Sequence, residues 1–271
     1  MGNTEKIQQK NVYAVIPARL FSTRLSNKLL LSLGGKPLIL HTLEQAKKAK
    51  NISRVIVATD SEEILKIIQT SGNEAVLTDK DHQSGSDRIA EVAETLPENS
   101  IIVNIQGDEP LISPATIESA VEAILLDETI DMATTCEPIY EIKDVLSADV
   151  VKVVTDKNDF ALYFSRLPIP FPREAVKKYG NLENALRGEK DLLKLYRKHT
   201  GLYVYRREFL LEFTKFEQTN LEKTEFLEQL RALENGARIK VVEVNESSIG
   251  VDTLEDFERV KKILENPKSK I

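Results

Sequence analysis

Three cations lie along one loop near the start of the chain, Arg19, Arg24 and Lys28, with hydroxyl side chains such as Ser22 between them. Guanidinium groups pair with phosphate oxygens bidentately and a lysine adds a point charge, so this loop fits a triphosphate. The chain contains neither a GxxxxGK[ST] nor a GxGxxG pattern, so phosphate binding here would depend on side chains. The residues alone also allow a second interpretation, in which this segment is a solvated basic loop that binds no ligand.

A carboxylate follows the most apolar segment of the first half. Residues 101–105 read IIVNI and are followed by Gln106, Gly107, Asp108, Glu109 and Pro110. A near-continuous apolar run is typical of a strand buried on both faces, and open α/β sheets bind ligands beyond the carboxyl ends of such strands. Asp108 is therefore the first candidate for chemistry, and the Glu-Pro pair after it is expected to form the turn.

A metal at Asp108 needs a second carboxylate from elsewhere, because adjacent residues on an extended segment point apart and Glu109 cannot share the ion. Asp252, which follows a turn and precedes a helix, is the best candidate. One or two aspartates completed by phosphate and water suit Mg²⁺. The same residue is equally suited to be the N-cap of the helix that follows, and the spacing leaves both readings open.

A third polar segment, residues 79–88, reads DKDHQSGSDR and follows a short predicted strand. Ser84, Gly85 and Arg88 have groups that could read a base edge and support phosphates. His82 could take part or could be an ordinary surface histidine, the commoner case for a lone histidine.

Composition narrows the class of protein. The chain has 271 residues, 41% of them hydrophobic and 30% charged, which is enough for a large α/β domain with a proper core. A net charge of -6 argues against a nucleic-acid-binding protein. The single cysteine, Cys136, excludes an internal disulfide framework and suits a reducing compartment, so a cytoplasmic location is expected. No apolar run is long enough for a membrane span and no signal peptide is visible.

Short apolar runs alternate with helical periodicity in the first half, which predicts βαβ units and a mostly parallel sheet. The predicted strands are 12–16, 54–58, 75–77, 101–105, 132–136, 150–155, 161–164, 201–205 and 239–244, and the predicted helices are 37–50, 62–70, 88–95, 114–126, 222–235 and 254–264. Residues 1–10 are expected to be a frayed tail. The charged segment 173–198 predicts one or two solvated helices.

Prolines at every second position mark residues 168–172, which read PIPFP. Because proline cannot donate a ladder hydrogen bond, this segment is expected to be an edge or an arm that packs on a partner subunit. No linker divides the chain, so a single domain over 1–271 is expected.

The ordered set of motifs resembles the 3-deoxy-manno-octulosonate cytidylyltransferase (CMP-Kdo synthetase) family over essentially the whole chain. The motifs are IPARLFSTRL, GGKPLI, VATD, HQSGSDR, IVNIQGDEP, VKVV, ALYFSRLPIPF, KHTGLYVYR, LEQLRALENG and GVDTLEDFERV. The resemblance implies a three-layer α/β/α nucleotide-diphospho-sugar transferase fold of Rossmann type with a smaller β-rich subdomain. It divides the domain into a CTP-binding half (12–135), a sugar-binding and dimerisation part (136–245) and a returning metal-ligand loop with the last helix (246–265).

The resemblance also implies an activity, the transfer of CMP from CTP to Kdo for lipopolysaccharide synthesis, with release of pyrophosphate, and a homodimer. Mg²⁺ is the implied cofactor, held by Asp108 and Asp252, which count as catalytic together with Arg24 and Lys28. The implied nucleotide contacts are Ala18, Arg19, Ser22, Arg24, Lys28, Ser84, Gly85, Arg88, Gln106 and Asp108. The implied sugar contacts are Gln106, Arg166, His199, Tyr203, Glu228 and Gln229.

The chain departs from the family pattern in the basic loop, where Ser26 and Leu29 stand at positions that are usually proline. Two fewer prolines should loosen the free loop and raise the cost of ordering it on CTP. Two alternatives stay open: the same transfer to 8-amino-Kdo or another sugar acid, and a non-catalytic nucleotide-binding regulator on the same fold. Gly250 favours ordinary Kdo, since the amino-sugar branch tends to carry an acid there.

Overall fold

The computed structural model describes residues 11–20, 25, 27–246 and 248–265. The chain forms two compact units, each assembled from separate segments. Unit 1 comprises Met1–Val121, Val204–Thr214 and Ser248–Ile271, and unit 2 comprises Glu122–Tyr203 and Lys215–Ser247. The first crossing between units therefore falls earlier in the chain than the 135/136 boundary expected from the sequence, and residues 204–214 return to unit 1 from the middle of the expected sugar-binding part.

Unit 1 is built on a parallel sheet. Its strands lie in the order β6-β1-β4-β5. They are β6 (Ile101–Asn104), β1 (Val12–Ala18), β4 (Arg54–Thr59) and β5 (Glu74–Leu77). All four residues of β6 are buried, as the apolar run predicts for a strand covered on both faces. All four carboxyl ends lie at one edge of the sheet.

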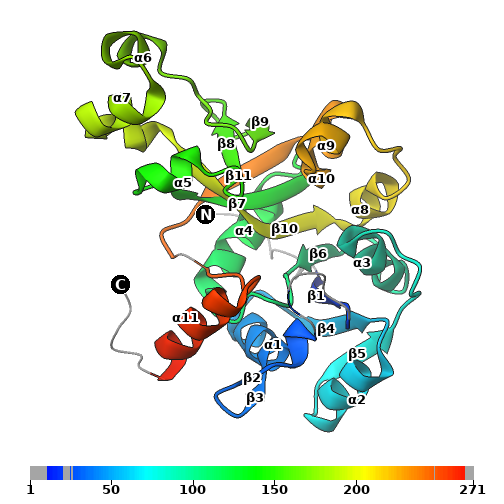
Figure 1. The fold of residues 1–271 in the computed structure, drawn as a ribbon. Coiled ribbons are helices and arrows are strands. Elements are labelled where there is room, and N and C mark those ends of the chain that lie inside the picture. The colour runs from blue at the N-terminus through cyan, green and yellow to red at the C-terminus, as the bar shows by residue number, and fades with distance from the viewer. Residues whose placement is uncertain (1–10, 21–24, 26, 247, 266–271) are drawn as a thin grey trace, which may run out of the picture. The chain divides into compact units, whose positions relative to one another are not determined.

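Helices cover both faces of this sheet (Figure 1). The connections through α1 (Leu38–Lys48) and α2 (Glu62–Thr70) carry the chain outward from β1 to β4 and β5, whereas α3 (Gly85–Glu94) carries it back to β6. Right-handed crossovers in opposite directions place α3 on the face opposite α1 and α2. The predicted α/β class with a mostly parallel sheet between two helical layers is confirmed.

Two helix starts follow from local capping. Helix α2 begins at its predicted residue, 62, because Ser61 is its N-cap and the Ser61 hydroxyl accepts from the Ile64 N–H. Helix α3 begins three residues before its predicted start because Ser84 and Asp87 form a reciprocal capping box. Part of the segment expected to be a binding loop is therefore the first turn of a helix.

The remaining elements of unit 1 are short, apart from the last helix. They are η1 (Lys28–Leu30), β2 (Ser32–Leu33), β3 (Lys36–Pro37), α8 (Arg207–Phe213) and α11 (Leu254–Glu265). Helix α4 (Pro114–Leu126) carries the chain from unit 1 into unit 2. Among the residues that the structure describes, no helix is long and apolar enough to cross a membrane.

Unit 2 contains a mixed sheet in which β11 lies beside β7 and β7 beside β10, while β8 pairs with β10 and β9. The strands are β7 (Met132–Pro138), β8 (Lys152–Thr155), β9 (Ala161–Ser165), β10 (Arg197–Arg206) and β11 (Ile239–Glu243). Strand β9 pairs antiparallel with β8 and leads into the proline-rich segment, which has neither helix nor strand over residues 166–172. An irregular arm after an edge strand agrees with the expectation from the prolines.

The helices of unit 2 include two corrections to the sequence prediction. They are α5 (Ile142–Leu146), α6 (Arg173–Tyr179), α7 (Leu182–Gly188), η2 (Lys190–Leu195), α9 (Asn220–Glu225) and α10 (Glu228–Glu234). The single helix predicted over 222–235 was wrong, because Phe226 adopts a left-handed φ of 54° and ends α9. The second correction concerns the charged segment 173–198, which was predicted to be solvated. It is anchored to the rest of unit 2, because its Leu186 and Tyr196 side chains are buried together with Ile139 and Val145.

Candidate active site

The polar residues singled out in unit 1 follow the ends of its parallel strands. Arg19 follows β1, Asp60 follows β4, Thr78 follows β5 and Asp108 follows β6. The carboxyl edge of an open α/β sheet is where the loops can enclose a ligand. Four segments that are far apart in the sequence are thereby gathered at one edge.

The two carboxylates predicted to form a pair do converge, and Lys28 lies with them. The Lys28 Nζ is 2.5 Å from Asp108 Oδ2 and 3.0 Å from Asp252 Oδ1. The lysine side chain is 10% exposed and the two carboxylates are 26% and 42% exposed. Burial alone would lower the pKa of Lys28, but the two carboxylates outweigh it and the pKa is raised, so the ammonium stays charged.

Backbone contacts fix Asp108 in this position. The Val251 N–H donates to the Asp108 carbonyl at 2.9 Å, which brings the loop that carries Asp252 alongside. The buried Thr42 hydroxyl of α1 donates to the Gly107 carbonyl at 3.0 Å. A Cβ at Gly107 would lie 3.3 Å from the Pro17 carbonyl oxygen, so only glycine allows this close approach to β1 without displacement.

The competing role for Asp252, the N-cap of the last helix, is taken by its neighbour. The Asp256 N–H donates to the Thr253 hydroxyl oxygen, and the Thr253 N–H donates back to the Asp256 carboxylate at 2.9 Å. This reciprocal pair caps α11. The side chain of Asp252 is instead turned to Lys28.

The donor set fits Mg²⁺ bound together with a phosphate. Within the described part of the chain, no three His, Cys, Asp or Glu side chains are grouped to hold a metal. Mg²⁺ commonly takes one or two carboxylates and fills its remaining positions with water and substrate phosphate. Asp108 and Asp252 supply two hard oxygen ligands within reach of one cation, which is the arrangement such a site needs.

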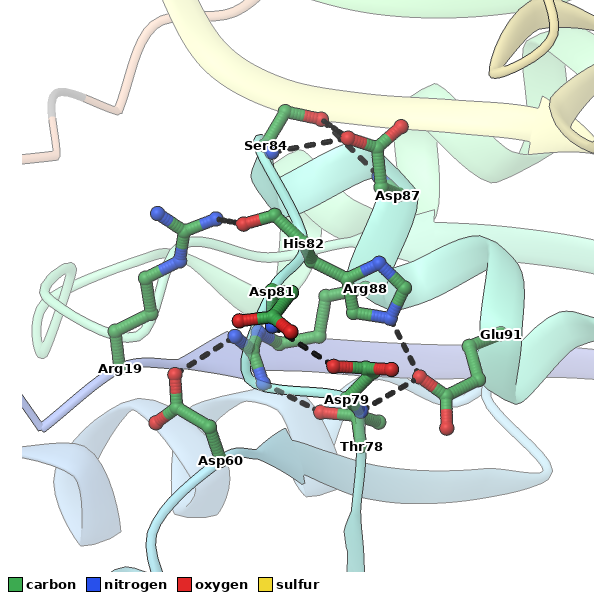
Figure 2. Close-up of polar contacts among 10 residues, drawn as sticks. All are labelled: Arg19, Asp60, Thr78, Asp79, Asp81, His82, Ser84, Asp87, Arg88 and Glu91. Carbon is green, nitrogen blue, oxygen red and sulfur yellow. Dashed lines mark hydrogen bonds and ion pairs between the residues drawn. The ribbon is translucent and has the colours of Figure 1, made fainter.

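The basic loop and the 79–88 segment meet at Arg19 (Figure 2). The Arg19 guanidinium donates to the His82 carbonyl at 2.5 Å. The His82 ring contacts the Glu91 carboxylate, which also accepts from the Asp79 N–H at 2.9 Å. Burial opposes the ionised form of Glu91, but the contacts with His82 and Asp79 prevail and its pKa is lowered. His82 therefore links the 79–88 segment to α3 through its contact with Glu91.

Arg88 was predicted as a nucleotide contact, and the structure assigns it a different place. Its side chain is 0% exposed, and its guanidinium binds Asp60 Oδ2 at 2.8 Å and the Thr78 hydroxyl. Burial lowers the pKa of Arg88, against the opposing effect of Asp60. Through these two contacts Arg88 ties the loop after β4 to the loop after β5 (Figure 2).

The other predicted nucleotide contacts differ in whether they are buried, hydrogen-bonded to other residues or outside the described part of the chain. The Ser84 side chain is occupied by the cap of α3, and Gly85 lies against Pro17, whose Cγ would be 3.7 Å from a Cβ there. Ala18 is buried at the end of β1. The Gln106 amide donates to Asn104 Oδ1 at 3.1 Å. Ser22 and Arg24 lie outside the described residues.

Three of the predicted sugar contacts form a cluster within unit 2. The Tyr203 hydroxyl donates to Gln229 Oε1 at 3.0 Å, and the His199 and Tyr203 ring centroids are 5.5 Å apart. Burial lowers the pKa of His199 to about 3, so the ring is neutral in the native protein. The Gln229 amide nitrogen is buried and has no hydrogen-bond partner among the residues that the structure describes. A buried donor left unpaired is costly, which marks this position as one that a ligand would satisfy.

Arg166 and Glu228 are also in unit 2, whereas Gln106 belongs to unit 1. The Arg166 side chain donates to the carbonyls of Glu225, Ala148 and Phe226. Those contacts use three of the five guanidinium N–H groups and hold the turn between α9 and α10. Glu228 is the first residue of α10 and follows that turn.

Several supporting residues were not singled out from the sequence. Thr42, Gly107 and Asp60 support the unit 1 edge, and Thr134 and Phe164 contact the His199 ring. Asp60, Gly107 and Phe164 stand inside the motifs VATD, IVNIQGDEP and ALYFSRLPIPF, which was the detectable hint. Thr42 and Thr134 act through contacts with residues distant in the sequence.

Comparisons with known proteins agree with this geometry. Residues 13–239 match the family described as cytidylyltransferase. The 3-deoxy-manno-octulosonate cytidylyltransferase of Trichlorobacter lovleyi is 50% identical over 250 residues, covering 92% of this chain and 97% of the relative. The chain belongs to the 3-deoxy-manno-octulosonate cytidylyltransferase family. The enzyme of that name from Geobacter sulfurreducens is 48% identical, with 92% and 98% of the two chains covered.

A solved member supports the same assignment from structure. A CMP:2-keto-3-deoxy-manno-octonic acid synthetase complexed with CTP superposes with a TM-score of 0.85 and 36% sequence identity. The match covers 95% of this chain and 100% of that one. The chain therefore shares the fold of that synthetase over 95% of its residues.

Proposed function

We propose that the protein transfers CMP from CTP to 3-deoxy-manno-octulosonate and releases pyrophosphate. The observation that carries the proposal is the convergence of Lys28, Asp108 and Asp252 at the carboxyl edge of a cytidylyltransferase sheet. The anomeric hydroxyl of the sugar acid attacks the α-phosphorus, a new phosphorus–oxygen bond forms, and the bond to the β-phosphate oxygen breaks. The hydroxyl proton is lost and pyrophosphate leaves, so no covalent enzyme intermediate is needed.

The basic residues of unit 1 serve the triphosphate in this proposal. Arg19, Arg24 and Lys28 neutralise charge on the phosphates, because negative charge builds on the leaving pyrophosphate, and the Ser22 hydroxyl donates a hydrogen bond to them. Asp108 and Asp252 hold Mg²⁺, which when bound supplies charge neutralisation and polarises the phosphoryl oxygen. Ala18, Gly85 and Gln106 line the nucleotide, and the Ser84 cap fixes the start of α3 beside Pro17.

In this proposal the sugar acid is bound by the predicted contacts that belong to unit 2. The neutral His199, Tyr203 and Gln229 suit hydroxyl groups, since they offer uncharged donors and acceptors. The Arg166 guanidinium has two N–H groups beyond those used by the three carbonyls, and these suit a carboxylate. Glu228 adds an acceptor at the start of α10.

We infer a homodimer from the exposed apolar side chains around the proline-rich segment. Leu162, Leu167 and Phe171 are 62%, 69% and 61% exposed. Apolar groups gathered on one arm are typical of a subunit interface. We place the enzyme in the cytoplasm, where CTP is available and where its one cysteine, which is buried, would stay reduced, and we expect its product to serve lipopolysaccharide synthesis.

A substrate panel tests the sugar specificity. Initial rates with Kdo, 8-amino-Kdo and a nonulosonate are compared at saturating CTP and Mg²⁺. We expect kcat/KM to be highest for Kdo, because Gly250 places no acid side chain next to Asp252. A higher kcat/KM for 8-amino-Kdo would show that this analogue, and not Kdo, is the preferred substrate. CTP binding without turnover of any of the three sugars would favour the non-catalytic regulator.

A further inference from the structure

The buried hydroxyl of Thr134, on β7, lies among groups that determine the direction of its hydrogen bonds. Its Oγ1 is 2.8 Å from the Leu202 carbonyl oxygen, 3.4 Å from that of Thr200 and 2.9 Å from His199 Nε2. Thr134 is 0% exposed, so water does not compete for these contacts. All of these residues belong to unit 2.

Only one distribution of protons satisfies this group. A hydroxyl has one hydrogen to donate, and a carbonyl oxygen can only accept. Thr134 therefore donates to Leu202, and the histidine must donate to Thr134. Nε2 then carries the ring proton, and Nδ1 of the neutral ring is left as an acceptor.

Packing keeps the imidazole in that orientation. The Phe164 ring contacts it edge-on, with centroids 4.9 Å apart and planes inclined by 75°. The Tyr203 ring lies 5.5 Å away on centroids, and the His199 N–H donates to the Val151 carbonyl at 2.9 Å. Because two aromatic rings pack against the imidazole, it cannot flip and exchange the positions of Nδ1 and Nε2 unless these neighbours repack. No described residue hydrogen-bonds to Nδ1.

We propose that Thr134 is a positioning residue that fixes His199 in the Nε2–H form, so that Nδ1 accepts a hydrogen bond from a hydroxyl group of the sugar substrate. This inference rests on the proposed function, which places His199 at the sugar. The histidine then acts as a neutral acceptor, complementing the Gln229 amide, which is a donor without a partner. The pair selects a polyol over an analogue that lacks the hydroxyl, because the acceptor would be left unpaired.

The tautomer can be measured on the whole protein without any assay of activity. We would record ¹⁵N spectra of ring-labelled histidine at pH 7.5 and identify His199 among the three histidines with single His→Gln variants. The proposal expects an unprotonated Nδ1 and a protonated Nε2 at His199. A protonated Nδ1, or a charged ring, would overturn it.

A matched pair of variants tests the consequence for substrate. Thr134→Ser keeps the hydroxyl, and Thr134→Val keeps the shape without it. We expect Thr134→Val to raise KM for Kdo roughly tenfold, as for one lost hydrogen bond, while KM for CTP stays unchanged and Thr134→Ser stays near wild type. Equal effects of both variants, or equal changes in both KM values, would refute the positioning role. Should the wild type fail to use Kdo, the proposed function falls, while the spectrum still decides the tautomer.

Discussion

The Lys28 Nζ lies 2.5 Å from Asp108 Oδ2, although the two residues are 80 positions apart in the chain. The contact joins the end of the basic loop to the end of β6, and Asp252 completes it from the C-terminal segment. A cation that would face the triphosphate is thus held beside the carboxylates that would face the metal. In the proposed function, phosphate binding and metal binding would be coupled through this one ammonium group.

Replacing Asp108 by Asn should abolish most turnover while leaving the fold intact. The loss of one metal ligand should lower kcat on the order of 100-fold, because metal stabilisation of the transition state amounts to several kcal/mol. The free energy of unfolding should change by about 1 kcal/mol or less, since Lys28 keeps Asp252 as a partner. Steady-state rates and thermal melts measure both effects. Asp252→Asn is the matched variant, and a large loss of stability in Asp108→Asn would make the residue structural.

Gly107→Ala should displace the turn that carries Asp108. The new Cβ would lie 3.3 Å from the Pro17 oxygen and 3.4 Å from Ile16 Cγ2, so the chain must move by a few tenths of an ångström. We expect about 1–3 kcal/mol of lost stability, as for other overpacked sites, together with a fall in kcat. Gly250→Ala is the control, because a Cβ there meets nothing within 4 Å. If both variants had the stability and kcat of the wild type, the close approach of Gly107 to Pro17 would be unimportant.

Arg88 and Arg19 should respond to mutation in opposite ways. Arg88→Met leaves the Asp60 carboxylate without its buried partner and should cost about 3–5 kcal/mol of unfolding free energy. Arg19→Ala removes an exposed side chain and should leave stability within about 0.5 kcal/mol while raising KM for CTP roughly tenfold. Arg24→Ala should likewise raise KM for CTP far more than KM for the sugar.

Chemical denaturation and CTP titration separate the two effects. A stable Arg88→Met variant with a raised KM for CTP would restore Arg88 as a direct nucleotide contact.

His199 should make the protein less stable in mild acid. Its native pKa is about 3 because of burial, whereas an unfolded histidine titrates near its ordinary value of about 6.5. Between those values the unfolded chain binds the extra proton, so the free energy of unfolding falls as pH falls below about 6.5. The difference should reach about 1 kcal/mol by pH ~5.5.

Urea unfolding at pH ~7.5 and ~5.5 tests this, with His199→Gln as the comparison. The variant should lose about 1 kcal/mol less than wild type over this interval at an unchanged m value. An identical loss in both proteins would show that His199 is not the group responsible.

The sequence was sufficient for the parallel sheet and for the edge where the candidate residues gather, because both depend on local patterns. The apolar run before Gln106 predicted a buried strand, and helical periodicity predicted the bounds of α2. The α9–α10 break could not be foreseen, since helical periodicity continues through Phe226 and only the backbone shows its left-handed turn. Nor could the spacing decide between Asp252 as ligand and as cap, because Thr253 is an equally good cap one position later.

The burial of Arg88 could not be foreseen for a similar reason. A sequence shows that an arginine is near a binding loop, but not whether its guanidinium faces solvent or the interior. Asp60 and Thr78, which hold it, lie on other loops, and neither was predicted to contact Arg88. Contacts between residues distant in the chain therefore decided the roles that local patterns left open.

The most direct test of the proposed activity is the product balance. The purified protein is incubated with CTP, Mg²⁺ and Kdo, and both pyrophosphate and the cytidylylated sugar are measured over time. The account predicts equal amounts of pyrophosphate and CMP-Kdo, with no release when the sugar is omitted. Absence of pyrophosphate release with both Kdo and its 8-amino analogue would contradict it.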